Sequence, residues 1–386
     1  MKNPLVISLI LCVLGLNAQE DKDYGSLDQG LTLPPHGDNQ KSFVKQHIGN
    51  LAWVSVTYNS PDVTSPSGKS RDGKIWGQLI PYGLTDLGFG PGNPAPWRVG
   101  ANENTIIVLS HDMEIEGKPI KAGTYGLHLI VNETRSWTWI FNKVTRSWGS
   151  YNYDESKDAL RVDVVPEDAP YQEWLNFEFT ERRTESVELS MFWERKRIPM
   201  KLTIPNMNEL YVNRFREELT GIAGFNHQNW LAAARFCAQR NYNLEEALVW
   251  ADKAINLPYT GIKSFGTLQA KGLVLMKLGR AKEAEEYFIS AVADQNSRSF
   301  PIHQYASEMI DAGMKIEALH VFEANYKKFK NTSLTSLGMA KGLSAIGKYK
   351  EAAKYAELAL EKEQNAEQKT QIEGWIQRLK NGEDIN

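Results

Sequence analysis

The spacing of four alanines in the C-terminal half restricts the fold of this chain more than any other feature. Each stands near the start of a segment in which apolar residues recur at helical intervals, and the four are Ala247, Ala284, Ala318 and Ala352. Their successive separations are 37, 34 and 34 residues. Self-similarity at such a period is typical of proteins built from stacked structural units. We therefore expect repeated helical units here rather than one globular core.

The segments that carry these alanines resemble the tetratricopeptide repeat (TPR), whose unit is a pair of antiparallel helices of about 34 residues. They read NYNLEEALVWADKAINLP, GRAKEAEEYFISAV, GMKIEALHVFEANY and GKYKEAAKYAELAL. Small residues, with two phenylalanines between them, stand where this family packs helix against helix: Gly272, Ala306, Ala340, Ala254, Ala291, Ala359, Phe288 and Phe322. The third unit departs from the pattern, with Asn325 where alanine is expected. The resemblance covers about residues 226–364 and implies a surface that binds a protein or peptide.

Further helical segments flank the repeats. In residues 205–225 we expect a linker helix that contains NMNELYVNRFREEL. The apolar residues on one face of this helix are Leu210, Phe215 and Leu219. Residues 368–380 also have an apolar face and are expected to cap the open end of the array. The repeat domain, with this capping helix, then spans residues 226–386.

Residues 51–204 follow a period of two instead. In TYGLHLIV, alternate residues from Tyr125 to Val131 are apolar, which is typical of a half-buried strand. The same alternation recurs in WTWIFN, LNFEFT, VELSMFW and MKLTI. Many short strands without intervening helices predict an antiparallel β-sandwich or jelly roll. Together with the helical repeats, the fold class is α+β multidomain.

The first 18 residues have the features of an export signal. Lys2 precedes an apolar run from Leu5 to Leu16, and Ala18 supplies the small residue that a signal peptidase requires. We expect a periplasmic or secreted protein, cleaved near Ala18. No other stretch approaches the roughly 20 apolar residues of a membrane span. Lipidation at Cys12 is the less favoured alternative, because that residue lies inside the apolar run.

Composition adds three expectations. Residues 19–50 lack a regular period and predict a loosely ordered arm, with a strand edge near Phe43 as its structured part. The formal net charge of -3 argues against a nucleic-acid partner. Once Cys12 is removed with the signal, only Cys237 remains, so no intramolecular disulfide can form. We expect Cys237 to be a buried structural thiol rather than a nucleophile.

Several separated motifs in residues 51–204 resemble an exported bacterial family known as domain of unknown function 2911. In chain order they are SGKSRDGKIWGQLIPYG, PWRVGANENT, GKPIKAGTYGL, WTWIFNK and WGSYNYDESKDALRV. This chain departs from the family by the insertion LTDLGFGPGNPA and by Val99, where threonine is common. The resemblance implies no established reaction and therefore assigns no catalytic residue.

The segment PAPWRVGANENTIIVLS places polar residues directly before an apolar strand. Gly100 allows a tight turn, and Arg98 offers a planar fork of donors that suits a carboxylate or a phosphate. Three tryptophans lie beside loop glycines rather than in alternating runs: Trp76, Trp97 and Trp148. We expect a polar ligand-binding rim, and its candidate residues are Lys69, Arg71, Trp76, Arg98, Asn102, Glu103 and His128.

A structural role for Arg98 is the alternative, in which it pairs with Glu103 or Asp72 and only holds two loops together. A binding role and a structural role make opposite predictions about whether the guanidinium has a partner within the protein. The sequence alone leaves both open.

Enzymatic motifs are missing from the sequence. There is no HExxH, no Gly-x-Ser-x-Gly elbow, no P-loop and no Gly-x-Gly-x-x-Gly after a strand. His111 and His128 are 17 residues apart and predict no metal site, and we expect no cofactor. The first hypothesis is an exported cell-envelope binding or adaptor protein. The alternative is an enzyme, such as a hydrolase, with a loop site around Arg98. It would be favoured if Glu103, His111 or His128 lined one pocket with Arg98.

Overall fold

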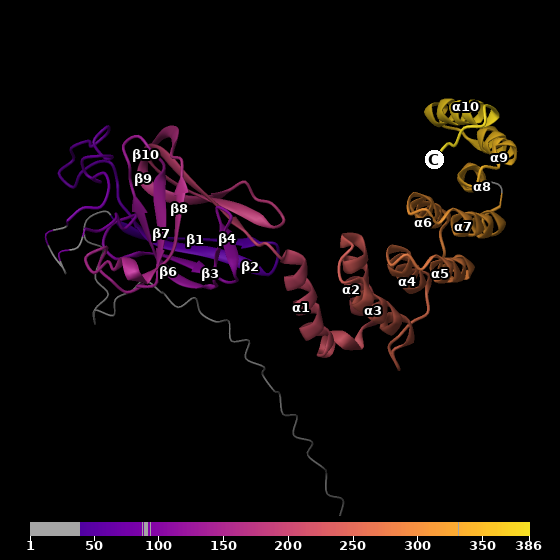
Figure 1. The fold of residues 1–386 in the computed structure, drawn as a ribbon, viewed down its shortest axis with the longest axis horizontal. Helices are drawn as coiled ribbons and strands as arrows, with labels where there is room; N and C mark the ends of the chain where they lie inside the picture. The colour runs from indigo at the N-terminus through magenta and orange to yellow at the C-terminus, as the bar shows by residue number, and fades with distance from the viewer. Residues whose placement is uncertain (1–38, 87, 89–91, 93, 331) are drawn as a thin grey trace, which may run out of the picture. The chain divides into compact units, whose positions relative to one another are not determined.

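The structure is a computed structural model that describes residues 39–386, apart from 87, 89–91, 93 and 331. The expected signal peptide, Cys12 and most of the expected arm lie outside the described residues. The chain divides into two compact units, one ending at Met207 and the other starting at Asn208. Strands make up the first unit and helices the second, as Figure 1 shows, which confirms the expected change from β to α structure. Each unit is described by itself below.

The strands of the first unit form two antiparallel sheets. Within the described residues, the larger sheet has the strand order β1-β2-β3-β6-β7-β8 and the smaller has the order β5-β4-β10-β9. The strands of the larger sheet are β1 (Gln40–Ile48), β2 (Ala52–Ser60), β3 (Thr105–Leu109), β6 (Gly123–Ile130), β7 (Trp137–Asn142) and β8 (Asp158–Val164). Those of the smaller sheet are β4 (Met113–Ile115), β5 (Lys118–Ile120), β9 (Glu167–Thr180) and β10 (Ser186–Thr203).

Aromatic side chains from both sheets meet in the interior of this unit. The ring of Tyr58 on β2 lies 5.0 Å from that of Phe177 on β9, measured between centroids. Trp139 on β7 lies 6.3 Å from the same Phe177 ring. Trp139 and Phe177 are both almost fully buried, so these contacts join the larger sheet to the smaller one.

Strand β1 corrects the expectation of a loose arm up to residue 50. Residues 40–48 pair with β2 along their whole length, from Gln40 opposite Ser60 to Ile48 opposite Ala52. The strand edge expected near Phe43 is therefore present, but it extends over nine residues. The apolar pattern of the sequence underestimated the length of this strand. β1 is an edge strand whose residues are mostly polar, and backbone pairing does not require apolar side chains at alternate positions.

The second unit contains helices that follow one another along the chain, with a 3₁₀ turn (Ile222–Phe225) between the first two. They are α1 (Met207–Leu219), α2 (His227–Arg240), α3 (Leu244–Asn256), α4 (Phe265–Lys277), α5 (Ala281–Ala293), α6 (Ser299–Asp311), α7 (Lys315–Lys328), α8 (Ser333–Ala345), α9 (Tyr349–Lys362) and α10 (Ala366–Lys380). Helices α2 and α3, α4 and α5, α6 and α7, and α8 and α9 contact as pairs, as Figure 1 shows. None of the helices in the described part of the chain is long and apolar enough to cross a bilayer.

The residues that revealed the repeats lie at the helix contacts. The four alanines of the 34-residue pattern all lie in the second helix of a pair and have no exposed surface: Ala247, Ala284, Ala318 and Ala352. A Cβ on Gly272 of α4 would lie 2.9 Å from the ring of Phe288 on α5. Small residues at these positions therefore let neighbouring helices approach closely.

Glycines end the first helix of three successive pairs. Gly279, Gly313 and Gly347 have φ angles of +75°, +81° and +79°, a conformation that glycine adopts at little cost. Each amide donates to a carbonyl in the last turn of its helix, as in Gly279 N to Met276 O at 3.0 Å. These C-terminal caps turn the chain toward the second helix, which explains why the glycines recur with the alanines.

Three further residues of this unit were singled out from the sequence. Cys237 on α2 has no exposed surface, and burial raises the pKa of its thiol to about 11, so it is an unreactive thiol. Phe215 on α1 contacts Phe236 and Trp250, so α1 packs within the helical unit. Asn325, which replaces the expected alanine, is buried and donates from Nδ2 to Ser299 O at 3.1 Å.

Candidate functional site

The first unit contains a cavity of about 340 Å³, which we call the Arg98 cavity. Its lining residues are Asn39, Pro61, Asp62, Pro66, Arg71, Leu79, Ile80, Pro81, Gly83, Thr85, Ala95, Pro96, Trp97, Arg98, Gly100, Ala101, Ser150 and Trp193. They come from the residue before β1, from the loops between β2 and β3, from the loop before β8, and from β10. The wall exposes polar and apolar surface in similar shares, so it can contact a small molecule that has both an apolar and a polar part.

Arg98 is the cation of this cavity that has no partner among the described residues. Its guanidinium makes no hydrogen bond or ion pair with any described residue, and Nε is fully enclosed without an acceptor. The two carboxylates proposed as structural partners are engaged elsewhere. Glu103 accepts a hydrogen bond from Asn59 Nδ2 at 2.8 Å, and Asp72 pairs with Arg195 Nη2 at 3.0 Å. A partly buried guanidinium without an acceptor is costly, which favours an external anion as its partner.

Gly149 makes room for the Arg98 side chain. A Cβ on Gly149 would lie 2.5 Å from Arg98 Nη1 and 2.7 Å from Arg98 Cδ. Gly149 also has a φ of +61°, which side chains with a Cβ rarely adopt. The guanidinium therefore lies directly against the backbone of the loop that carries Ser150.

The Arg98 loop is held by the larger sheet on both sides. Trp97 N donates to Leu129 O on β6 at 3.0 Å, and Ala101 N donates to Asn59 O on β2 at 3.1 Å. Between them, Val99 has a φ of +55°, which is unusual and strained for a β-branched residue. Thr105 Oγ1 donates to Val99 O at 2.7 Å and helps to keep this conformation. Strain that is maintained by several contacts is typical of binding and catalytic loops.

Tryptophans form the apolar wall beside Arg98. The rings of Trp97 and Trp193 are stacked, with centroids 5.7 Å apart and planes 18° from parallel. Trp193 lies between two paired positions of β10 where the register with β9 shifts, and such an irregularity re-aims a side chain. Trp76 does not line the cavity. It packs edge-on against both rings at 5.8 Å and supports them from behind.

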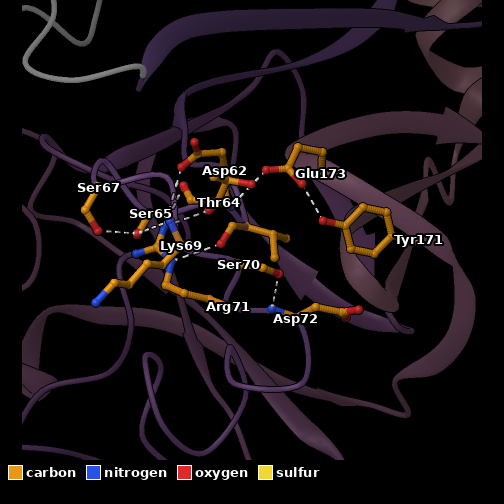
Figure 2. A network of polar contacts seen from close by, with 11 residues as sticks. Asp62, Thr64, Ser65, Ser67, Lys69, Ser70, Arg71, Asp72, Tyr171 and Glu173 are labelled. Carbon is orange, nitrogen blue, oxygen red and sulfur yellow. Dashed lines mark hydrogen bonds and ion pairs between the residues drawn. The ribbon is translucent and has the colours of Figure 1, made fainter.

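Arg71 and Lys69 belong to a loop that is tied to β9 by polar contacts, as Figure 2 shows. Arg71 Nε donates to Val63 O at 3.0 Å, and Nη2 donates to Asp62 O at 2.9 Å. Glu173 on β9 accepts from Thr64 N at 2.8 Å. Arg71 lines the cavity but its donors already serve this loop, so it shapes the wall. Lys69 is exposed and is not part of the lining.

The structure thus brings only some of the sequence-predicted site residues to the cavity. Arg71 and Arg98 line it and Trp76 lies behind its wall, whereas the other four do not line it. Those four are Lys69, Asn102, Glu103 and His128. Asn102 has a φ of +57° and helps to form the turn after Arg98. Glu103 is bound to Asn59, as described above.

His128 lies behind the cavity wall rather than in it. It is almost fully buried on β6, and burial lowers the pKa of its imidazole to about 4. Its Nδ1 is 3.0 Å from Ser150 Oγ, and Ser150 lines the cavity next to Arg98. Ser150 could not be predicted from the sequence, because a serine in the loop sequence SWGSYNY matches no nucleophile motif.

Below Ser150, a buried cluster fixes the rest of this loop. The Tyr153 ring contacts His128 edge-on, with 5.5 Å between centroids. Tyr153 Oη donates to Asp158 Oδ2 at 2.7 Å, and Arg161 Nε donates to the same oxygen at 2.7 Å. Burial raises the pKa of Tyr153 well above its usual value, so its hydroxyl stays protonated. The loop from Gly149 to Asp158 is therefore held in one conformation against β6 and β8.

The histidines do not form a metal centre in the described part of the chain. His111 Nδ1 is 2.9 Å from Ser110 Oγ, and Asp112 bonds Lys121 and the amide of Ala122. No group of three or more histidine, cysteine, aspartate or glutamate side chains is placed to hold a metal ion among the described residues.

The second unit has a groove of about 640 Å³ along α2, α4 and α6. Its lining residues are Gln228, Leu231, Arg235, Gln239, Ser264, Phe265, Gly266, Gln269, Leu273, Asn296, Arg298, Phe300, Pro301, Gln304 and Tyr305. This lining contains two arginines, several amides and no carboxylate. Gln269 is almost fully buried and accepts from Arg235 Nη2 at 3.4 Å, while its Nε2 has no acceptor among the described residues.

Comparison with known proteins supports the family resemblance of the first unit. Residues 39–202 match the model of the family described as "Protein of unknown function (DUF2911)". This match begins at the start of β1 and ends at the end of β10, so it covers both sheets and the whole Arg98 cavity. No curated protein matches the chain. Because the matched family has no described function, the function has to be argued from the site.

Three solved structures have partial similarity to the chain. MamA protein is 17% identical, with 42% of this chain and 83% of that chain covered and a TM-score of 0.31. YrrB, described as a TPR protein with an unusual peptide-binding site, is 17% identical, with 44% and 84% covered and a TM-score of 0.30. PilW, described as a widely conserved type IV pilus biogenesis factor, is 20% identical, with 43% and 76% covered and a TM-score of 0.33.

Proposed function

We propose that this chain is an exported binding or adaptor protein. In this proposal the two sheets pack as a β-sandwich that binds a small ligand with an anionic group in the Arg98 cavity. The helix pairs stack as a TPR solenoid that binds a protein or peptide partner. One observation carries the proposed ligand binding. Arg98 lines the cavity, and its buried Nε has no acceptor among the described residues.

The chemistry of the cavity supports a ligand with two parts. Arg98 presents parallel N–H donors, which match the two oxygens of a carboxylate or phosphate. Beside it, the half-buried Trp97, which stacks on the buried Trp193, offers apolar surface for a planar group. A volume of about 340 Å³ is at the lower end of small-molecule sites. A compact aromatic or unsaturated acid therefore fits both the size and the charge.

The groove of the second unit supports the proposed partner docking. Arg235 and Arg298 line it without any carboxylate, and the unpaired Nε2 of Gln269 supplies a buried donor. These groups favour a segment that is rich in acceptors, such as an extended peptide with acidic residues. The export signal, on which the periplasmic or secreted location rests, is a sequence inference from residues 1–18.

The test of ligand binding uses thermal unfolding of the full chain with four probes of similar size. Benzoate and phenylphosphonate carry an anion on an aromatic ring, benzyl alcohol is neutral and benzylamine is cationic. The two anions should raise the melting temperature by a few degrees at about tenfold excess over Kd, whereas the other two should not. Equal stabilisation by benzyl alcohol and benzoate would rule out an anion site at Arg98.

Two matched variants test whether the stabilisation by the anionic probes depends on Arg98. Arg98→Gln keeps a polar side chain but removes the charge, and it should abolish the stabilisation by both anions. Arg135 is an exposed arginine without a hydrogen bond or ion pair to any described residue, so Arg135→Gln is the control. The control variant should respond to the probes as the wild type does.

A further inference from the structure

We infer that Ser150 is the nucleophile of an acyl-transfer site, with His128 as its general base, and that the site hydrolyses esters that carry an anionic group. The inference rests on the proposed binding of an anion by Arg98, and it adds a reaction to that binding. Ser150 and Arg98 line the same cavity, while His128 lies behind Ser150. A nucleophile, a base and an anchor for substrate are thus in contact with one cavity.

The distance between serine and histidine suits proton transfer. Ser150 Oγ and His128 Nδ1 are 3.0 Å apart, within the range of a nucleophile–base pair. Ser150 retains 4% exposure and lines the cavity, and His128 is 2% exposed. Both side chains are therefore nearly enclosed. The ester carbonyl, the leaving alcohol and the attacking water would all have to approach the pair from the cavity side of Ser150.

The proposed role requires one tautomer of the imidazole. The proton must be on Nε2, which leaves Nδ1 free to accept the proton of Ser150.

The loop geometry presents the serine to the cavity. Gly149 precedes Ser150 in the left-handed conformation, with a φ of +61°, and forms a sharp turn. The Arg98 side chain lies against Gly149, the residue directly before Ser150, so the guanidinium contacts the loop that carries the serine. An anionic group held by Arg98 would bring a neighbouring ester carbonyl next to Ser150 Oγ.

The reaction is balanced without any co-reactant other than water. Ser150 Oγ attacks the ester carbonyl and its proton passes to His128 Nδ1. The bond between the carbonyl carbon and the alkoxy oxygen breaks, and the leaving alcohol takes the proton from His128. Water then attacks the acyl-serine while His128 accepts a proton from it, and the carboxylic acid leaves as Ser150 regains its proton. No carboxylate hydrogen-bonds His128 among the described residues, so the turnover should be slow.

The first experiment labels the full chain with a fluorophosphonate, whose phosphorus bonds serine oxygen as fluoride leaves. Mass spectrometry of the digested protein should find one adduct, on the peptide that contains Ser150. Ser150→Ala should remove it, and His128→Gln should slow labelling at least about tenfold. Ser156→Ala, a change of an exposed serine in the same loop, should leave it unaffected. Because wild-type labelling identifies the residue, the result does not depend on whether any variant folds.

The second experiment measures hydrolysis of 4-acetoxybenzoate and of its neutral counterpart 4-acetoxybenzamide. The wild type should cleave the anionic ester at a rate above that of Ser150→Ala, with kcat/KM at least about tenfold higher than for the amide-bearing ester. No adduct on Ser150, together with hydrolysis equal to that of Ser150→Ala, would overturn the inference.

The two proposals fail in different ways. If Ser150→Ala still binds benzoate but the wild type neither labels nor hydrolyses, the binding function stands and the reaction is excluded. If Ser150 labels and both esters react equally in the wild type and in Arg98→Gln, the nucleophile stands, while the anionic substrate class and the proposed function of Arg98 are wrong.

Discussion

The guanidinium of Arg98 and the hydroxyl of Ser150 differ in how visible they are from sequence. Arg98 could be predicted because an arginine beside a glycine turn, directly before an apolar strand, has a recognisable chemistry. Ser150 and its contact with His128 could not, since Ser150 lies 22 positions after His128 with strand β7 between them, and no motif joins them. The structural alternative for Arg98 also needed coordinates, because only they place Glu103 and Asp72 with other partners.

Gly149→Ala tests the fit between Arg98 and its loop. The added Cβ would lie 2.5 Å from Arg98 Nη1, so the flexible guanidinium must move, and the φ of +61° adds backbone strain. We expect a loss of about 1 kcal/mol in stability and a larger loss in affinity for benzoate. Thermal unfolding with and without ligand measures both. Unchanged affinity in a destabilised variant would show that the position of Arg98 does not matter for binding.

Burial of His128 predicts a pH dependence of stability. Its pKa is about 4 in the folded protein, whereas an exposed imidazole has a pKa of 6.5, so the unfolded chain binds more protons between these two pH values. The contribution of neutral His128 to the free energy of unfolding is fully present above pH 6.5. It is lost as the pH drops toward 4, and the loss amounts to about 3 kcal/mol. His128→Gln removes this contribution, so its loss of stability between pH 6.5 and 4 should be smaller than that of the wild type. Identical pH profiles for the two proteins would contradict a neutral, buried imidazole.

Among the helices and strands, those with a strong periodicity of apolar or small residues were the ones that could be predicted from the sequence. The 34-residue spacing placed the second helices α3, α5, α7 and α9, since buried alanines are required at each contact. Alternation placed β6, β7, β9 and β10. Strand β1 was largely missed because edge pairing requires no apolar alternation. The cavity could not be predicted, because its wall combines loops that periodicity does not describe.

Two helix glycines provide a matched pair of substitutions. A Cβ on Gly338 of α8 would lie 2.5 Å from the ring of buried Phe322, whereas a Cβ on Gly374 of α10 would meet nothing within 4 Å. Gly338→Ala should therefore lower stability by about 1 to 3 kcal/mol through overpacking. Gly374→Ala should raise it by about 0.5 to 1 kcal/mol, because alanine restricts the unfolded chain. Chemical denaturation measures the change in unfolding free energy for each variant. Changes of the same sign in the two variants would contradict the helix contacts described here.

On the scale of the whole molecule, the two units have separate cores. The buried residues of the helices form one cluster that contains no residue of the sheets. We expect residues 206–386 alone to fold as helix and to melt at the temperature of the corresponding transition in the full chain. Circular dichroism of this fragment tests that expectation. A random-coil spectrum would show that the helical unit depends on the sheets.

The most direct test of the central claim, that Arg98 binds an anion, is the Kd of benzoate or phenylphosphonate for wild type and Arg98→Lys by calorimetry. Lysine keeps the charge but loses the planar fork, so we expect Kd to rise at least about tenfold, or about 1.4 kcal/mol. The melting temperature without ligand should hardly change, because the guanidinium has no partner among the described residues. An unchanged Kd with a clearly lower melting temperature would instead make Arg98 a structural residue.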